Sequence, residues 1–182
     1  CVQSSYIPWK GYFDQIRMAD VFIFYDDVQF TKEDWRNRNF IKTPNGIKPL
    51  TIPCGKHINR LICEVEILDD YWQKKHWLSI VHNYTKAKFF KKYSGFFEEL
   101  YLQKTWNNLS DLNQTFIKKI SNNILKTNTE FIDSRDFNLP INVHKEDRWL
   151  ELLKLVGATN FIIGPSAKNY LDEDKQKKIY QK

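Results

Sequence analysis

The chain has 182 residues, for which one compact domain is the expectation, and its 42% hydrophobic and 15% aromatic content excludes an intrinsically disordered protein. Its net charge of +6 agrees with an anionic substrate, with an acidic membrane surface, or with an ordinary lysine-rich solvated surface. The three cysteines have no zinc-site spacing and no apolar run is long enough to span a bilayer, so we expect a cytoplasmic protein with reduced thiols and no transmembrane segment.

The first predicted elements form a βαβ unit. A helix over 11–19 carries apolar residues on one face, and the apolar run 21–25 predicts a buried strand that is followed by Asp26 and Asp27. A strand ending at residues 1–2 would precede the helix and complete the unit.

The middle of the chain changes from a strand pattern to a helical one. Segments 47–53 and 61–68 alternate or cluster apolar residues and are separated by a turn-prone stretch, so we predict that they pair as strands. From about 69 to 126 the apolar residues recur at helical spacing, which predicts a helical insertion of three amphipathic helices. Their apolar stripes are expected to face the core.

The last predicted elements return to the order of strand and helix. A strand over 129–133 precedes a helix over 149–156 that ends at Gly157, where a left-handed backbone favours glycine, and a final apolar strand covers 161–163. This order predicts an α/β fold: a Rossmann-like parallel sheet with a helical insertion, in a single domain over 1–182. Ligands bind at the carboxyl ends of such strands, which singles out the loops 3–11, 26–39 and 164–170.

The first of these loops combines polar groups with a rigid backbone. Gln3 and Tyr6 precede Pro8 and Trp9, and Gly11 opens the predicted helix. The free N–H groups of a helix N-terminus attract phosphate or carboxylate, so we predict that Gln3, Tyr6 and Trp9 bind the substrate. The alternative is a strand-to-helix turn on which Trp9 packs.

The second loop holds the densest group of functional side chains in the chain. Asp26 and Asp27 follow a predicted strand, where carboxylates can hold Mg²⁺ or act as a general base; the alternative is that one of them caps the next turn. Arg36 and Arg38 would face the same way in an extended segment and clamp a phosphate or carboxylate, whereas a helical segment would separate them. Further substrate contacts are expected from Gln29, Lys32 and Asn39.

His76 is the histidine that we predict as a catalytic general base, because an imidazole titrates near neutral pH. Its place on the polar or boundary side of a helix is also typical of a structural histidine. Cys54 is interpreted as a small buried residue, since a nucleophilic thiol needs a nearby base. From the third loop, Ser166 and Tyr170 are expected to bind the substrate.

These motifs resemble those of the WbqC-like family of bacterial surface-polysaccharide biosynthesis proteins. The resemblance covers nearly the whole chain and rests on separate segments, among them Tyr6-Ile7-Pro8-Trp9, Gly11-Tyr12-Phe13, Asp26-Asp27-Val28-Gln29, Asn37-Arg38-Asn39, Leu50-Thr51-Ile52-Pro53, Lys75-His76-Trp77 and Gly164-Pro165-Ser166-Ala167. It implies a role in O-antigen or capsule (lipopolysaccharide-type) synthesis, as a transferase that places an acyl or aminoacyl group on a nucleotide-activated amino sugar.

The expected partner is therefore an anionic small molecule, such as a nucleotide sugar or an activated acyl donor. The alternative is a non-catalytic module that binds a glycan or a partner through the same aromatic-rich cleft. The sequence has no signature of a nucleic-acid-binding motif, so nucleic acid is not an expected partner. The motifs specify neither a cofactor nor an oligomeric state.

Overall fold

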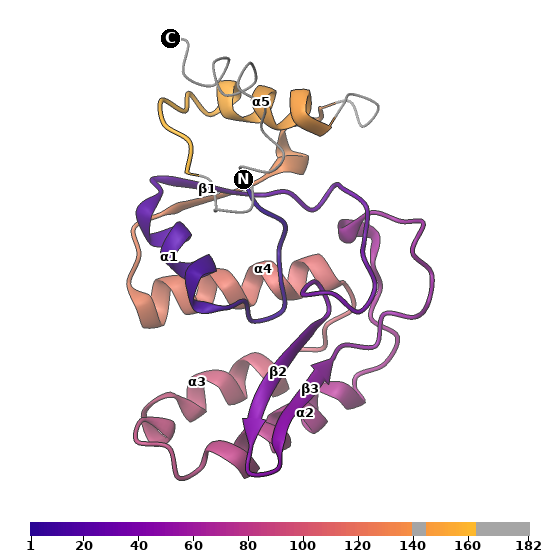
Figure 1. Cartoon of the computed structure of the whole chain (residues 1–182), viewed down its shortest axis with the longest axis vertical. Helices are drawn as coiled ribbons and strands as arrows, with labels where there is room; N and C mark the ends of the chain where they lie inside the picture. The colour runs from indigo at the N-terminus through magenta and orange to yellow at the C-terminus, as the bar shows by residue number, and fades with distance from the viewer. Residues whose placement is uncertain (140–144, 163–182) are drawn as a thin grey trace.

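The computed structural model describes residues 1–139 and 145–162. A small parallel sheet lies between helices, and a β-hairpin with further helices forms a second layer below it (Figure 1). The helices and strands, in chain order, are α1 (Lys10–Met18), β1 (Val21–Phe24), β2 (Arg38–Thr43), β3 (Gly46–Thr51), α2 (Tyr71–Tyr84), α3 (Phe90–Leu102), α4 (Leu109–Lys119), β4 (Glu130–Asp133) and α5 (Lys145–Leu155). Short 3₁₀ turns cover Ile62–Glu64 and Ser134–Phe137, and a π-helical turn covers Ile120–Leu125.

The parallel sheet is built on β1. β4 pairs with β1 in parallel over the full length of both strands. On the other edge, Val2 forms a parallel bridge with Phe24, through hydrogen bonds from Val2 N to Ile23 O (2.9 Å) and from Tyr25 N to Val2 O (3.1 Å). The predicted strands at 21–25 and 129–133 and the helix α1 are confirmed, and so is a mixed α/β chain with a parallel sheet. A Rossmann-like sheet stays a prediction.

The two faces of β1 pack on different helices because successive side chains of a strand point to opposite sides. One face packs on α1 and α4, and the other packs on α5 (Figure 1). The first cluster contains Tyr12, Ile16, Phe22, Phe24 and Ile117, and the second contains Ile23, Tyr25 and Leu152. The carboxyl end of β1 is therefore held in place from both sides of the sheet.

The second layer consists of the β2–β3 hairpin packed with α2 and α3. β2 pairs antiparallel with β3, from Arg38 opposite Thr51 to Thr43 opposite Gly46. Gly46 has φ +107°, a conformation that glycine adopts without a Cβ penalty. Apolar and aromatic side chains fill the space between the hairpin, α2, α3 and α4, among them Tyr6, Leu50, Trp72, Trp77, Tyr101 and Phe116.

The predicted pairing of 47–53 with 61–68 is wrong. β3 pairs with β2, because Pro44 and Asn45 form a two-residue turn that brings these neighbouring segments together. Segment 61–68 contains one 3₁₀ turn, and its side chains Ile62, Val65 and Ile67 enter the core from an irregular backbone. The apolar spacing in this segment therefore reflected burial and not membership of a sheet.

The three helices predicted between 69 and 126 are confirmed as α2, α3 and α4. Asp69 accepts a hydrogen bond from Tyr71 N (3.0 Å) at the start of α2, and Asn108 accepts one from Asp111 N (3.1 Å) at the start of α4. α4 runs between the parallel sheet and the second layer, so its faces belong to two core clusters (Figure 1). No helix within the described ranges has both the length and the apolar character needed to cross a membrane.

The predicted helix near the C-terminus is confirmed, and the strand predicted after it is not. Leu152 of α5 is fully buried, and Gly157 has φ +64° as expected for a glycine that terminates a helix. Phe161 and Ile162 are not part of a strand, because Phe161 stacks on Trp149 of α5 with ring centroids 5.0 Å apart. Residue 163 lies outside the described residues.

Candidate functional site

The first two predicted ligand-binding loops meet next to the parallel sheet. Arg36 Nη1 donates to Gln3 Oε1 at 3.1 Å. Asn39 Nδ2 donates to the carbonyl of Tyr6 at 3.1 Å, and Tyr6 N donates to the carbonyl of Trp35 at 2.9 Å. Gln3, Tyr6, Arg36 and Asn39, which the sequence predicted as substrate contacts, therefore belong to one hydrogen-bonded structure.

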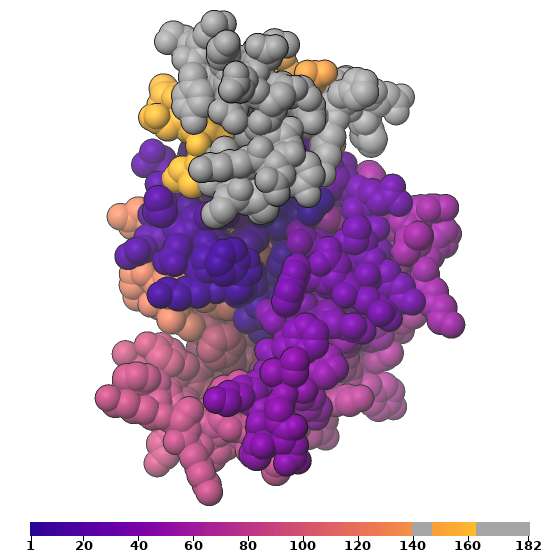
Figure 2. Space-filling model, viewed as in Figure 1, coloured from indigo at the N-terminus to yellow at the C-terminus, as the bar shows by residue number. Residues whose placement is uncertain are grey.

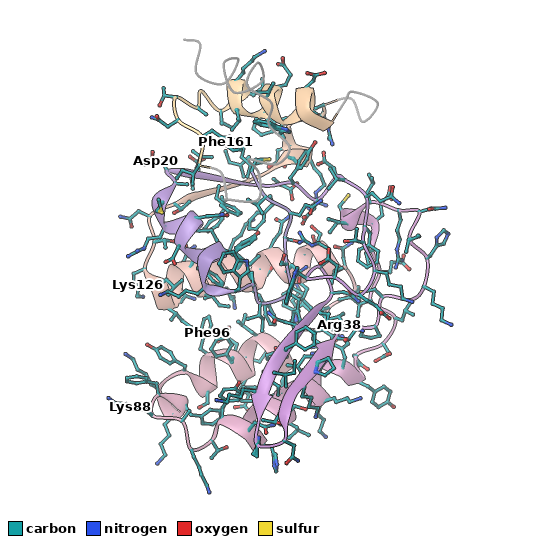
Figure 3. The ribbon with its side chains drawn as sticks, in the orientation of Figure 1. Asp20, Arg38, Lys88, Phe96, Lys126 and Phe161 are labelled. Atoms are coloured by element: carbon teal, nitrogen blue, oxygen red, sulfur yellow. The ribbon has the colours of Figure 1, made fainter. Side chains whose placement is uncertain are left out.

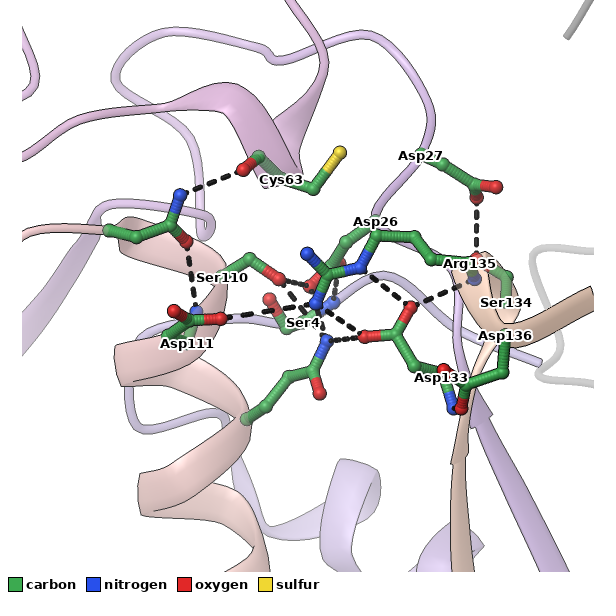
Figure 4. A network of polar contacts seen from close by, with 12 residues as sticks. Ser4, Asp26, Asp27, Cys63, Ser110, Asp111, Asp133, Ser134, Arg135 and Asp136 are labelled. Carbon is green, nitrogen blue, oxygen red and sulfur yellow. Dashed lines mark hydrogen bonds and ion pairs between the residues drawn. The ribbon is translucent and has the colours of Figure 1, made fainter. Parts of the chain in front are cut away.

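Asp26 is the centre of a buried polar network at the carboxyl end of β1 (Figure 4). Its Oδ1 accepts a hydrogen bond from Ser4 N at 2.8 Å. Its Oδ2 accepts from Ser110 Oγ at 2.5 Å and from Gln114 Nε2 at 3.2 Å. These donors compensate a carboxylate that has no contact with solvent, and they join the first loop, the sheet and α4 at one point.

Asp27 has a separate set of partners. Its carboxylate accepts from Ser134 Oγ at 2.5 Å and forms an ion pair with Arg148 of α5. Arg148 Nη1 also donates to the carbonyl of Asp27 at 3.0 Å. Because the two charged side chains are only 7% and 5% exposed, this pair attaches α5 to the end of β1 without competition from water.

The sequence reasoning missed Asp133, which ends β4. Gln114 Nε2 donates to Asp133 Oδ2 at 2.6 Å, so one amide group bridges Asp26 and Asp133 (Figure 4). Arg135 donates to Asp133 from Nε at 2.9 Å and from Nη2 at 2.7 Å. Burial raises the pKa of Asp133, but the hydrogen bonds from Arg135 and Gln114 outweigh burial and lower that pKa below its usual value. Its position at the end of the predicted strand 129–133 was the signal that could have found it.

The carboxylates of this network already accept hydrogen bonds from other groups of the protein. Within residues 1–139 and 145–162, no three His, Cys, Asp or Glu side chains are grouped so that they could hold a metal ion. The catalytic role predicted for Asp26 and Asp27 stays a prediction.

His76 and Tyr6 are brought together from distant parts of the chain. Tyr6 Oη lies 2.9 Å from His76 Nδ1 and 2.5 Å from Tyr101 Oη. Tyr6, His76 and Tyr101 are 1%, 3% and 0% exposed. The predicted place of His76 on the polar or boundary side of its helix is therefore wrong: the buried face of α2 carries His76 together with Trp72 and Trp77.

The burial of this cluster shifts its protonation equilibria. Burial, followed by the positive charge of Lys75, lowers the pKa of His76 to about 4, although a hydrogen bond with the backbone of Thr51 acts in the opposite direction. Burial raises the pKa of both Tyr6 and Tyr101 above its usual value. All three side chains are therefore uncharged at neutral pH.

A cavity of about 410 Å³ opens next to this cluster, between β3 and α2. Its polar lining consists of Lys48, Thr51, Asp69, Tyr71, Lys75, His76 and Ser79, so two lysines and one carboxylate face the same space. Lys48 Nζ donates to Ser79 Oγ at 3.1 Å, and the ring of Tyr71 is 84% exposed. Apart from His76, these residues were not predicted from the sequence as part of a site. Lys75 could have been found, because it precedes the predicted catalytic residue His76.

The two arginines of the predicted anion clamp have different partners. Arg36 lies in a turn and not in the extended segment on which the prediction depended, whereas Arg38 is the first residue of β2. Arg38 Nε donates to Thr51 Oγ1 at 2.9 Å, and its guanidinium lies 3.8 Å from the carboxylate of Glu33.

The remaining predicted contacts lie apart from the cavity. Trp9 is 67% exposed, and its ring covers Gly11 so closely that a Cβ there would lie 1.9 Å from it. Gln29 Nε2 donates to the carbonyl of Ile58 at 3.2 Å, and Lys32 pairs with Glu33 at 3.8 Å. The third loop, with Ser166 and Tyr170, lies outside the described residues.

Comparison with known proteins agrees with the motifs. The model of the WbqC-like protein family matches residues 3–180. The chain is also 40% identical over 174 residues to a protein of Mycobacterium tuberculosis (strain ATCC 25618 / H37Rv) named "Uncharacterized protein Rv1507c", a match that covers 94% of this chain and 74% of that protein. No solved structure matches the chain. The chain therefore belongs to the WbqC-like protein family.

Proposed function

We propose that this protein is a transferase of surface-glycan biosynthesis, which places an acyl or aminoacyl group on a nucleotide-activated amino sugar. We further propose that the cavity between β3 and α2 binds this anionic substrate. The observation that carries the proposal is the meeting of two lysines, an exposed aromatic ring and a buried neutral imidazole around one cavity. Its volume of about 410 Å³ is typical of small-molecule sites.

Lys48 and Lys75 supply the positive charge in the proposed complex. They project from β3 and α2, on the two sides of the cavity. Two ammonium groups that line one pocket can bind the two phosphates of a nucleotide sugar. The exposed ring of Tyr71 offers a flat apolar face to a nucleobase or a sugar ring. The hydroxyl of Thr51 accepts from Arg38 and can still donate its own proton to a sugar hydroxyl.

His76 takes the proton in the proposed reaction. The amine nitrogen of the sugar attacks the acyl carbonyl carbon and forms a C–N bond, and the bond from that carbon to the leaving group breaks. His76 accepts the proton that the amine loses and passes it to the leaving group. A pKa of about 4 keeps the imidazole unprotonated at neutral pH, and an anionic substrate bound in the cavity would raise this pKa and so make His76 a stronger base. The Tyr6–Tyr101 pair suits either tautomer of His76, because Tyr6 can donate to Nδ1, or accept from Nδ1–H and donate to Tyr101.

Calorimetric titration with a uridine-diphosphate-linked amino sugar tests the proposed binding site. Lys48→Ala and Lys75→Ala should each weaken binding by about tenfold, since each removes one charge-assisted contact. Lys74→Ala is the matched control, because Lys74 precedes Lys75 on α2 and does not line the cavity. Equal weakening by all three variants, or by none, would contradict the assignment.

Product mass separates the transferase from a non-catalytic glycan-binding module. The protein is incubated with amino-sugar nucleotides together with acyl-coenzyme A, or with ATP and amino acids, and the sugar nucleotide is weighed by mass spectrometry. A gain equal to one acyl or aminoacyl group supports the transferase. Binding at the cavity without any change of mass supports the glycan-binding module, for which the exposed side chain of Tyr71 in the cavity lining is the favouring observation.

A further inference from the structure

The turn between α2 and α3 is rich in lysine and free of acidic residues. Residues 71–97 contain six lysines and neither aspartate nor glutamate. Four of these lysines, at positions 86, 88, 91 and 92, are exposed on or next to the turn. We call residues 85–92 the basic corner. The lysine ion pairs found within the described residues lie elsewhere, at Lys32, Lys119 and Lys154, so the charge of the basic corner is not neutralised by neighbouring carboxylates.

An exposed phenylalanine lies among these lysines. Phe89 is 57% exposed, and Lys88 Nζ lies 5.3 Å from the centroid of its ring. The next residue, Phe90, is directed into the fold, where it stacks on Trp77 at 6.4 Å between centroids. One phenylalanine therefore anchors the turn, and burial in the fold does not explain the other.

The basic corner projects from the body of the molecule. Figure 2 shows this part of the chain, in pink at the lower left, as a convex corner. Lys88 extends from it into solvent (Figure 3). A convex surface can touch a plane, but it offers no groove to a ligand.

We propose that the basic corner docks the protein on a membrane surface that contains anionic phospholipids. Lysines next to such a surface are attracted by its negative potential, and an aromatic ring among them can enter the boundary between headgroups and acyl chains. The long stems of the lysines allow their ammonium groups to stay at the headgroups while Phe89 enters.

A single-stranded nucleic acid is the competing partner, and the geometry favours the membrane. Nucleic-acid sites of this kind are grooves that follow the backbone and use arginine together with stacked aromatic rings. The basic corner is convex, and residues 71–97 contain no arginine.

Docking at this corner would also bring the proposed cavity close to the membrane. α2 has 14 residues, which corresponds to a length of about 20 Å; it lines the cavity with residues between Tyr71 and Ser79 and ends at Tyr84, directly before the basic corner. A substrate carried on a lipid headgroup would then lie within reach of the cavity. The membrane proposal itself does not depend on the reaction, because its surface shares no residue with the cavity.

Sedimentation with lipid vesicles tests the proposal on the full chain. The protein should bind vesicles of equal parts phosphatidylglycerol and phosphatidylcholine, should not bind phosphatidylcholine alone, and should be released by high salt. The quadruple variant Lys86→Gln/Lys88→Gln/Lys91→Gln/Lys92→Gln should bind more than about a hundredfold more weakly, since each lysine near an anionic surface contributes about fivefold. Phe89→Ala should weaken binding by about tenfold at unchanged net charge.

A second quadruple variant serves as the matched control. Glutamine at Lys10, Lys56, Lys104 and Lys154, which are exposed elsewhere, gives the same net charge and should leave more than half of the vesicle binding intact. Equal loss in both quadruple variants would mean that total charge, and not the basic corner, drives binding. Retention of a single-stranded RNA oligonucleotide through Lys86 and Lys88, with no binding to vesicles, would overturn the proposal in favour of a nucleic acid. The quadruple variant of the basic corner should bind the nucleotide sugar as the unmodified protein does. This titration therefore distinguishes failure of the membrane proposal from failure of the proposed cavity site.

Discussion

Replacing Arg148 with methionine tests how α5 is attached to the parallel sheet. The variant keeps a long side chain but removes the cation, so within residues 1–139 and 145–162 the buried carboxylate of Asp27 retains only Ser134 as a side-chain partner. Removal of one member of a buried ion pair costs about 3–5 kcal/mol, because the other charge stays uncompensated. In a chain of this size each kcal/mol lowers Tm by about 2–4 °C, so the expected decrease is about 6–20 °C.

The assay is thermal and urea unfolding followed by circular dichroism. The double variant Asp27→Asn/Arg148→Met is the control, because it leaves no uncompensated charge and should recover most of the lost stability. Limited proteolysis around α5 supplies a second measurement, since the helix can detach before the rest of the chain unfolds. The reasoning is refuted if Arg148→Met loses less than about 1 kcal/mol and α5 resists the protease as it does in the unmodified protein, because the pair would then behave like an exposed one.

Three other changes test the network, the buried histidine and the end of α5. Gln114→Leu removes the amide that bridges Asp26 and Asp133, so urea unfolding should show a loss of about 2 kcal/mol; an unchanged midpoint would contradict the bridge. Acidification from about pH 6.5 to pH 4 should destabilise the protein, because the pKa of His76 is about 4 in the fold and 6.5 as its ordinary value, so the unfolded chain binds the extra proton in this range. The histidine part of this loss, up to about 1.4 kcal/mol per pH unit, should be absent from the urea unfolding of His76→Gln. Gly157→Ala should lose about 1 kcal/mol in thermal unfolding because of its φ of +64°, and a smaller effect for alanine than for asparagine would contradict this reason.

The elements with strong periodicity could be predicted from the sequence. β1, α1 and the helices between 69 and 126 carry apolar residues at the spacing of one secondary structure, and all of them are confirmed. β2 was missed because four of its six residues are polar and the strand is only partly buried, so its pairing depends on the turn at Pro44 and not on an apolar pattern. In 61–68 the apolar residues correctly predicted burial, but the predicted strand was wrong.

The candidate site was harder to predict because its members are joined by the tertiary structure. The meeting of the loops at Gln3 and Arg36 followed from the rule that ligand loops share one edge of a sheet. The contact between Tyr6 and His76 followed from no local pattern, since it depends on how α2 packs on the first loop. Lys48 was missed because a lone lysine on a hairpin strand is indistinguishable from an ordinary solvated residue.

The hydroxyl of Tyr6 also constrains the order in which this chain can mature during translation. Its two partners in the core, His76 and Tyr101, follow it by 70 and 95 positions. At about 5–20 residues per second, the ribosome needs roughly 5–20 s more after Tyr6 before Tyr101 is synthesised. During that interval the hydroxyl of Tyr6 lacks its partner Tyr101, so the segment around Tyr6 must stay exposed, and available to chaperones, until α3 has left the exit tunnel.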